Sequence, residues 1–266
     1  MTPMIKIVLV DTTHPGNIGA GARAMKTMGL ERLTLVSPQR FPSAECTARA
    51  AGADDLLARA EVFSSLEDAV ADCALVFGAS ARTRSIAWPE VTPETAATQI
   101  LDQVGNGGGA AILFGRESSG LSNEQLEVCH AMIRIPTNAD FASLNIAAAV
   151  QIICYEINKQ RLARAAAAED GLTGVSAGAG PRPAAPDTDV NASPGDDGTV
   201  APVTTKDMEY LYEHLEQTLD RVGYLDRKKP RHLMRRLRRL FNRARLDSNE
   251  YNILRGILTA IGNSRG

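Results

Sequence analysis

Aromatic residues and cysteine pairs are scarce in this 266-residue sequence. Phe, Trp and Tyr together make up 5% of the chain, and there is one tryptophan. The four cysteines stand singly, without the C-x-x-C spacing of zinc ligands: Cys46, Cys73, Cys129 and Cys154. This spacing argues against a metal site and against a disulfide framework. We expect the cysteines to be small buried hydrophobic residues.

The sequence also lacks long apolar runs. No stretch reaches the roughly 18 apolar residues that a transmembrane helix needs, and the amino terminus leads directly into a predicted strand. These absences predict neither a membrane span nor a signal peptide, and hence a cytoplasmic protein. The chain of 266 residues is long enough for one sizeable α/β core with something smaller beside it, and its hydrophobic content of 44% is ordinary.

Charge is distributed unevenly around the net value of −2. Residues 1–163 carry 13 basic and 17 acidic side chains, whereas residues 206–266 carry 14 basic and 8 acidic ones. Between positions 221 and 245 there are eleven Lys or Arg residues and one acid, Asp226. A helical segment this basic is typical of a surface that binds nucleic acid. A solvated face, or one that binds an acidic partner, is the alternative.

Apolar runs and helical periodicity alternate along the first 160 residues. Runs at 5–10, 33–36, 75–78, 110–114 and 132–135 predict buried strands. Helical patterns separate them at about 18–28, 44–60, 66–72 and 93–104, and another begins at 146. Strands that alternate with helices predict an α/β fold with a mostly parallel sheet covered on both faces.

The composition changes abruptly after this alternating region. From 165 to 202 it is dominated by Ala, Gly, Pro, Ser, Thr and Asp, which cannot bury enough surface to offset the entropy of ordering. Helical stripes of apolar residues resume at about 206. We therefore predict a domain at 1–164, a flexible linker at 165–205 and a basic helical tail at 206–266.

Two polar loops follow predicted strands and so lie at the carboxyl edge of the sheet, where ligands usually bind. The first, at 115–121, contains two glycines and Glu117, and the second, at 136–145, contains Ser143 and Asn145. Glycine lets the backbone approach a ligand closely. The alternative is that the glycines form turns and that Ser143 or Asn145 caps a helix.

Two more loops follow strands nearer the amino terminus. Glycines 16, 19 and 21 do not match G-x-G-x-x-G, and no Gly-Lys-Ser/Thr follows, which disfavours dinucleotide and nucleoside triphosphate sites. Asn17 and Arg23 are suited to hold a phosphate or ribose, unless Asn17 caps the helix and Arg23 is solvated. In the loop at 78–89, Arg82 and Arg84 suit phosphates, and Trp88 either stacks on a base or is buried.

Taken in order, these loops resemble a known superfamily. The runs NIGAGAR, FGRESSGL and IPT…SLN resemble the three signature motifs of the SPOUT methyltransferases, which use S-adenosyl-L-methionine. Within that superfamily, the runs HPGNIGAGARAMKTMGL, SARTRSIAWP and HLMRRLRRLF…NILRGIL resemble the TrmJ family of tRNA (cytidine/uridine-2′-O-)-methyltransferases. That family modifies nucleotide 32 in the anticodon loop. The resemblance covers nearly all of the chain except the linker.

The resemblance implies a fold, an assembly and a cofactor pocket. It implies a carboxyl-terminal trefoil knot in the methyltransferase domain and a homodimer with cofactor sites near the subunit interface. It assigns S-adenosyl-L-methionine to Ala79, Ser80, Ala81, Gly115, Arg116, Glu117, Gly120, Ile135, Ala142, Ser143, Leu144 and Asn145. We further expect tRNA to contact Asn17, Arg82, Arg84, Lys228, Lys229, Arg235, Arg236, Arg238 and Arg239.

Arg23 is the candidate catalytic residue that the resemblance implies. A guanidinium keeps its proton under ordinary conditions, which makes it a poor base. We interpret Arg23 as a clamp on the reacting ribose and its phosphate, with proton loss assisted by that phosphate or by water. Two alternatives remain: a non-catalytic RNA-binding module on a degenerate SPOUT fold, and a 2′-O-methyltransferase of another tRNA or rRNA site.

Overall fold

The computed structural model describes residues 4–80, 88–173, 202–225 and 232–263. Within these residues, seven parallel strands form one sheet in the order β3-β2-β1-β6-β4-β7-β5. The strands are β1 (Ile5–Val10), β2 (Arg32–Val36), β3 (Glu61–Phe63), β4 (Cys73–Ala79), β5 (Glu90–Val91), β6 (Gly109–Phe114) and β7 (Ala131–Ile133). The α/β class with a parallel sheet is confirmed.

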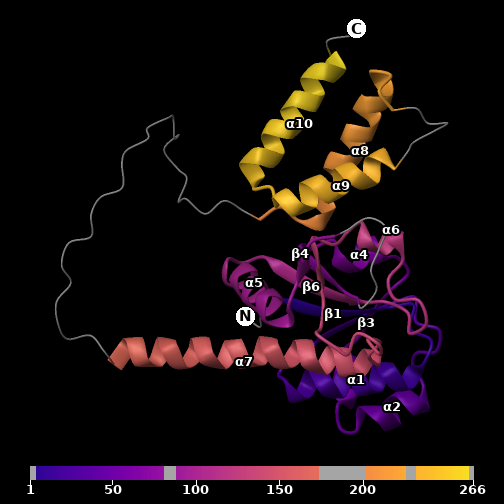
Figure 1. Cartoon of the computed structure of the whole chain (residues 1–266), viewed down its shortest axis with the longest axis vertical. Coiled ribbons are helices and arrows are strands. Elements are labelled where there is room, and N and C mark those ends of the chain that lie inside the picture. Colours follow the sequence, from indigo (N-terminus) through magenta and orange to yellow (C-terminus); the bar gives the residue numbers. More distant parts are fainter. Residues whose placement is uncertain (1–3, 81–87, 174–201, 226–231, 264–266) are drawn as a thin grey trace.

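Helices connect the strands and cover both faces of the sheet (Figure 1). They are α1 (Pro15–Thr27), α2 (Ala44–Ala50), α3 (Asp54–Ala58), α4 (Leu66–Val70), α5 (Pro93–Gly105), α6 (Asn123–Leu126) and α7 (Ile146–Thr173). Their starts follow ordinary capping rules: the side chains of Ser43, Ser65 and Thr92 accept from backbone N–H groups of α2, α4 and α5.

Alternation along the strands assigns the helices to the two faces. On β1, Ile7 and Leu9 point to the face covered by α1, α2, α3, α5 and α7. These two residues and buried residues of the five helices form one apolar cluster. Val8 and Val10 point the other way, into a second cluster that includes residues of α4 and α6. Burial on both faces explains why the central strands read as continuous apolar runs.

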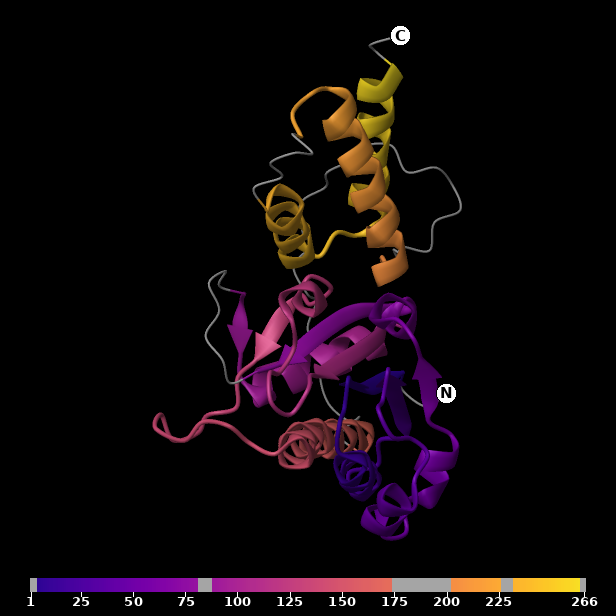
Figure 2. The same ribbon diagram turned by 90° about the vertical axis from the view of Figure 1, so that its right-hand side faces the viewer.

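The last three helices form a separate small bundle: α8 (Thr205–Arg221), α9 (Leu233–Ala244) and α10 (Ser248–Asn263). Figures 1 and 2 show it stacked against the α4 and α6 side of the sheet. Its apolar core centres on Met208, Leu211, Tyr212 and Leu258. The start of α8 contacts the larger domain directly, because the Thr205 hydroxyl donates to the Cys73 carbonyl at 2.8 Å.

Several predicted boundaries are wrong. The segment 44–60 is not one helix, because Ala51 and Gly52 adopt positive φ values of 46° and 91° and separate α2 from α3. The strands β3 and β5 were not predicted. Helix α7 continues to Thr173, nine residues into the predicted linker. The remainder of that linker up to residue 201 lies outside the described residues.

Single-residue expectations can also be checked. All four cysteines are buried and unpaired, as predicted, and burial raises the pKa of Cys73 and Cys154 to about 12. Trp88 is buried, and its indole N–H donates to the Cys129 carbonyl at 3.1 Å. None of the described helices combines the length and apolarity that crossing a bilayer requires. Among the described residues, no cluster of His, Cys, Asp or Glu is arranged to hold a metal ion.

Candidate active site at the carboxyl edge of the sheet

A cavity of about 150 Å³ opens where β4, β6 and β7 end and α7 begins. Its apolar walls come from Ala79, Phe114, Ile133, Ile135, Ile146 and Ala149. Its polar rim comes from Ser80, Arg116, Glu117, Ser118, Thr137 and Ser143, and Gly115, Gly120, Ala142 and Leu144 complete the lining. An apolar slot with a few polar groups is the usual form of a site for a small organic cofactor.

Nearly all the cofactor residues that the resemblance assigns converge on this cavity. Of the described cofactor residues, only Asn145 is not part of the lining, and it directly follows the lining residue Leu144 in the sequence. Ala81, Arg82, Arg84, Lys228 and Lys229 lie outside the described residues. Sequence reasoning missed Phe114, Ser118, Ile133, Thr137, Ile146 and Ala149. Four of these six belong to the predicted strands or the predicted loops, so their position near the sheet edge was the available signal.

The loop after β6 closes tightly on itself at the cavity. Gly120 donates its N–H to the Arg116 carbonyl at 2.7 Å, and Gly120 has a φ of 68°. A Cβ on Gly115 would lie 2.2 Å from the carbonyl carbon of Gly120 and from the nitrogen of Leu121. No larger residue fits at position 115 without moving the backbone that lines the cavity.

Glu117 fastens this loop to the loop after β1. Its Oε2 accepts from the backbone N–H of Thr13 at 3.1 Å and from the Thr13 hydroxyl at 2.8 Å. Its Oε1 accepts from the backbone N–H of His14 at 3.1 Å and from Asn17 Nδ2 at 3.0 Å. Burial acts to raise the pKa of Glu117, but the hydrogen bonds from Asn17, the backbone and Thr13 outweigh burial and lower the pKa to about 2.

Asn17 extends the same network to the third loop. Its Oδ1 accepts from Asn145 Nδ2 at 2.9 Å, and Asn145 Oδ1 accepts from the backbone N–H of Ala147 at 2.9 Å, inside the first turn of α7. Asn17 therefore connects to two segments, those of Glu117 and Asn145, that lie 100 and 128 residues away from it in the sequence. Their polar atoms hold the loops together around the cavity.

The amino-terminal glycines serve helix packing. The helix begins at Pro15, not at residue 18, so Gly16 and Gly19 lie within α1. A Cβ on Gly19 would lie 2.0 Å from the Cys46 carbonyl oxygen of α2, so this glycine lets the two helices touch. Arg23, two turns along α1 from Asn17, is exposed and does not line the cavity within the described part of its own chain.

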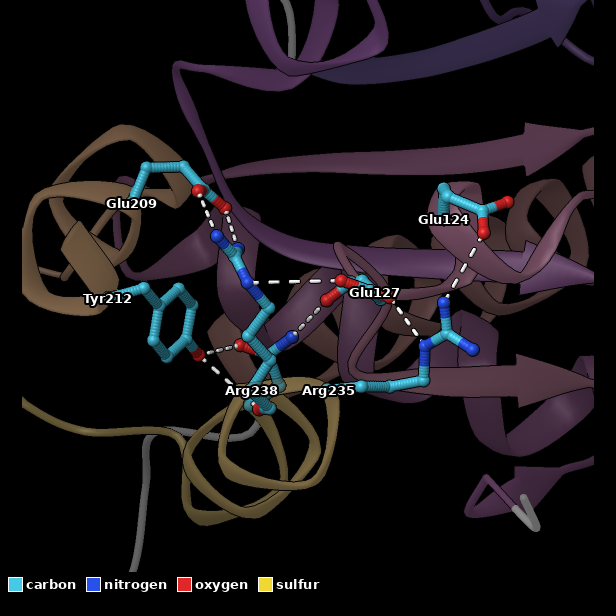
Figure 3. Close-up of polar contacts among 7 residues, drawn as sticks. Glu124, Glu127, Glu209, Tyr212, Arg235 and Arg238 are labelled. Carbon is cyan, nitrogen blue, oxygen red and sulfur yellow. Dashed lines mark hydrogen bonds and ion pairs between the residues drawn. The ribbon is translucent and has the colours of Figure 1, made fainter. Parts of the chain in front are cut away.

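The basic tail presents its arginines in two ways. Arg235 and Arg238 of α9 form ion pairs with Glu127, and each also pairs with a second glutamate, Glu124 and Glu209 respectively (Figure 3). Arg236 is exposed and Arg239 is half-buried, and neither has a side-chain partner within the described residues. The four tail arginines predicted to bind tRNA are thus not equivalent.

Two parts of the chain match known protein families. Residues 4–155 match the SpoU rRNA methylase family, and residues 206–265 match the carboxyl-terminal domain of the tRNA methyltransferase TrmJ. The chain belongs to the SpoU methylase family. Its second domain places it among the TrmJ members.

Individual relatives match nearly the whole chain. The chain is 44% identical over 259 residues to the tRNA (cytidine/uridine/adenosine-2′-O-)-methyltransferase TrmJ of Pseudomonas aeruginosa, covering 97% of this chain and 94% of that one. It is 42% identical over 257 residues to the tRNA (cytidine/uridine-2′-O-)-methyltransferase TrmJ of Sodalis glossinidius, covering 97% and 91%. The crystal structure of TrmJ from Z. mobilis ZM4 superposes with a TM-score of 0.76 at 32% identity, covering 97% and 99%.

Proposed function

We propose that this chain transfers a methyl group from S-adenosyl-L-methionine to a ribose 2′-hydroxyl of tRNA. The observation that carries the proposal is the cavity at the carboxyl edge, which two of the motif loops line and the third supports through Asn17, in a chain whose full-length relatives are tRNA 2′-O-methyltransferases. S-adenosyl-L-methionine would supply the methyl group as an electrophile bound in this cavity. The chain's own residues bind it, position the ribose and exclude water.

The residues of the cavity fit an adenosine. Ala79, Ile133 and Ile135 offer flat apolar contacts to a ring, and the Gly115 backbone permits close approach. The Glu117 carboxylate already accepts four hydrogen bonds from Thr13, His14 and Asn17. We therefore assign Glu117 to holding the loops rather than to a direct hydrogen bond with the cofactor.

We propose a homodimer as the active form. Exposed large apolar side chains lie beside the cavity and along α7: Phe141 is 80% exposed, Tyr155 51% and Leu162 60%. Exposed apolar side chains on neighbouring segments support an interface with a second copy of the chain. Because Arg23 is exposed and does not line the cavity of its own chain, a second copy is suited to bring its Arg23 to the ribose bound here. The trefoil knot that the resemblance implies stays a prediction.

The target is proposed to be nucleotide 32 of the anticodon loop, in cytoplasmic tRNA. The Pseudomonas relative is named for cytidine, uridine and adenosine, and the Sodalis relative for cytidine and uridine. Tolerance of different bases agrees with a site that acts on the ribose, since the reacting hydroxyl is common to all nucleotides.

Nucleoside mass spectrometry tests this proposal. Unmodified tRNA transcripts are incubated with the purified chain and S-adenosyl-L-methionine, and the methylated nucleotide is mapped by fragment analysis. The expected product is a 2′-O-methylated ribose at position 32. Methylation of rRNA alone would contradict the assignment of tRNA as the substrate. Methylation of a different tRNA ribose would contradict the assignment of nucleotide 32.

A non-catalytic RNA-binding module on a degenerate SPOUT fold is the second candidate. Isothermal titration calorimetry with S-adenosyl-L-methionine separates the two, because a degenerate cofactor site binds none. The intact cavity lining favours the enzyme.

A further inference from the structure

Helix α9 has three faces of different character. Met234, Leu237 and Phe241 form an apolar seam, and two of these, Met234 and Phe241, pack on the core of the small bundle. A second face, formed by Arg235, Arg238 and Asn242, is turned toward α6 and α8. The third face carries Arg236, Arg239 and Arg243, which have no side-chain hydrogen bond or ion pair within the described residues.

The second face is held by ion pairs with little exposure. Arg235 Nε donates to Glu127 Oε1 at 2.6 Å, and Arg235 Nη2 donates to Glu124 Oε1 at 3.3 Å. The side chains of Arg235 and Glu127 are 17% and 22% exposed, whereas that of Glu124 is 77% exposed. The pair with Glu127 is therefore the less screened of the two.

Arg238 connects the same glutamate to helix α8. It donates to both carboxylate oxygens of Glu209, at 2.7 Å through Nη2, and its Nε lies 3.9 Å from Glu127 Oε2 (Figure 3). Its guanidinium carbon lies 4.4 Å from the centre of the Tyr212 ring. The guanidinium is thus shared between a carboxylate of its own bundle, an aromatic face and a carboxylate of the larger domain.

Asn242 completes the docking without any charge. It is 5% exposed, its Nδ2 donates to the Glu127 carbonyl at 2.8 Å, and its Oδ1 accepts from the buried Tyr212 hydroxyl at 2.5 Å. Burial is the main cause that raises the pKa of Tyr212, so this hydroxyl keeps its proton and remains a donor. A buried amide with both ends paired fixes the orientation of α9 on the larger domain.

The docking point is a direct continuation of the cavity. Glu124 belongs to α6 and Glu127 follows its last residue. Helix α6 begins three residues after Gly120, which is the last residue of the cavity loop that lines the cavity. The Ser122 side chain caps α6, and Gln125 Nε2 donates to Asp11 Oδ2 at 2.9 Å, at the end of β1. The small bundle is therefore attached to the segment that holds the cavity loop in place.

We infer that Arg235 and Arg238 are positioning residues, which set the small bundle on α6, and that the free face of Arg236, Arg239 and Arg243 binds the tRNA phosphates. This inference rests on the proposed tRNA substrate. A phosphate backbone is bound by cations that are not already neutralised. Arg235 and Arg238 are already neutralised by glutamates, whereas the arginines of the free face are not. Docking then decides where the bound tRNA lies relative to the cavity.

The chain offers a matched test, because paired and free arginines are adjacent in α9. In the full-length protein, Arg236→Gln with Arg239→Gln removes two charges from the free face. Arg235→Gln with Arg238→Gln removes the same charge from the docked face of the same helix. For each variant, tRNA affinity is measured against salt concentration, and the methylation rate is measured in a single turnover at saturating tRNA.

The free-face variant is expected to bind tRNA about 10-fold more weakly, with a salt slope lower by roughly 2 and an unchanged saturated rate. The docked-face variant is expected to keep the salt slope and to lose about 10-fold in the saturated rate, since a displaced substrate reacts slowly. S-adenosyl-L-methionine affinity stays at the wild-type value in both. An equal drop in salt slope in both variants would show four RNA ligands and overturn the inference.

A double-mutant cycle distinguishes loss of the Glu127–Arg235 pair from independent misfolding of the two variants. Glu127→Gln and Arg235→Gln are each expected to slow the saturated rate, and the double variant to be no slower than the worse single one. Fully additive losses would overturn the pairing.

Hydrogen exchange along α9, measured without tRNA, reports the docking of α9 on the larger domain independently of activity. Faster exchange in the docked-face variant supports the positioning role of Arg235 and Arg238, and unchanged exchange overturns it. A wild-type chain that leaves tRNA unmethylated would instead contradict the proposed function.

Discussion

Two glutamates, Glu117 and Glu127, show how differently two parts of the larger domain are built, the cavity and the surface that meets the small bundle. Glu117 at the cavity accepts from neutral donors, two backbone N–H groups, a hydroxyl and an amide, all within its own domain. Glu127 at the other site is paired with arginines of a second domain. The first arrangement fixes loops that must be preorganised for a cofactor. The second joins two separately packed units.

The difference predicts that substitutions at the cavity and substitutions in the small bundle have different effects. Changes at the cavity should abolish cofactor binding and lower the stability of the larger domain. Changes in the bundle should leave cofactor binding intact and alter only the encounter with tRNA and its placement.

The largest effect is expected for Gly115→Ala. The new methyl group would meet the Gly120 and Leu121 backbone at 2.2 Å, so the loop must move and the cavity must change shape. We expect cofactor affinity to fall by about 100-fold, with destabilisation of roughly 2–4 kcal/mol. Calorimetry and urea unfolding measure both.

Gly105→Ala at the end of α5 is the matched control. A Cβ there meets nothing within 4 Å, and no positive φ constrains the residue. It is expected to bind cofactor normally, with stability unchanged or raised by up to about 1 kcal/mol through helix propensity. Equal cofactor affinity in the two variants would contradict the close approach at Gly115.

Arg23→Ala is expected to separate binding from chemistry. Arg23 is exposed and does not line the cavity of its own chain, so cofactor affinity should stay within a few-fold of wild type. Loss of the clamp on the ribose should slow single-turnover methylation by about 100-fold. If cofactor binding disappears as well, the assignment of Arg23 to the ribose is wrong.

Leu162→Glu tests the proposed homodimer. Leu162 is 60% exposed on α7, and a carboxylate on an apolar interface costs association energy. Light scattering should give twice 28.4 kDa for the wild type and a mixture or monomer for the variant, with activity falling in parallel. A fully active monomer at nanomolar concentration would contradict the shared site.

The smallest expected effect is the pH dependence that Glu117 contributes. Its pKa is lowered from 4.5 to about 2, so the carboxylate stabilises the fold above pH 4.5 and this contribution disappears as the pH falls toward 2. The free-energy difference in unfolding between wild type and Glu117→Gln should be about 2 kcal/mol near neutral pH. It should shrink through that acidic window, and a difference independent of pH would contradict the network.

Much of this architecture can be predicted from sequence, because buried parallel strands and amphipathic helices leave periodic patterns. The strands at β1, β4 and β6 and the loops that follow them were predicted on that basis. The edge strand β3 was missed because Val62 is 55% exposed and the strand has three residues. The end of α7 was misplaced because Ala-rich composition fits a linker as well as a helix.

Contacts between distant segments were beyond reach of sequence reasoning. Glu117 was predicted as a cofactor ligand, but its four hydrogen bonds come from Thr13, His14 and Asn17, which lie 100 or more residues away. Arg235 and Arg236 look alike in the sequence, and only tertiary structure shows that one meets Glu127 and the other is exposed. Local patterns specify which element forms, not which side chain it will meet.

The central claim is that the cavity binds the cofactor and the small bundle binds tRNA. Its most direct test compares a chain that stops after Thr173 with the full-length protein. The shortened chain keeps every described residue of the cavity and lacks the bundle. It is expected to bind S-adenosyl-L-methionine with unchanged affinity, to bind tRNA at least about 10-fold more weakly, and to show a markedly smaller salt slope. Equal tRNA affinity and an equal salt slope in both chains would contradict this claim.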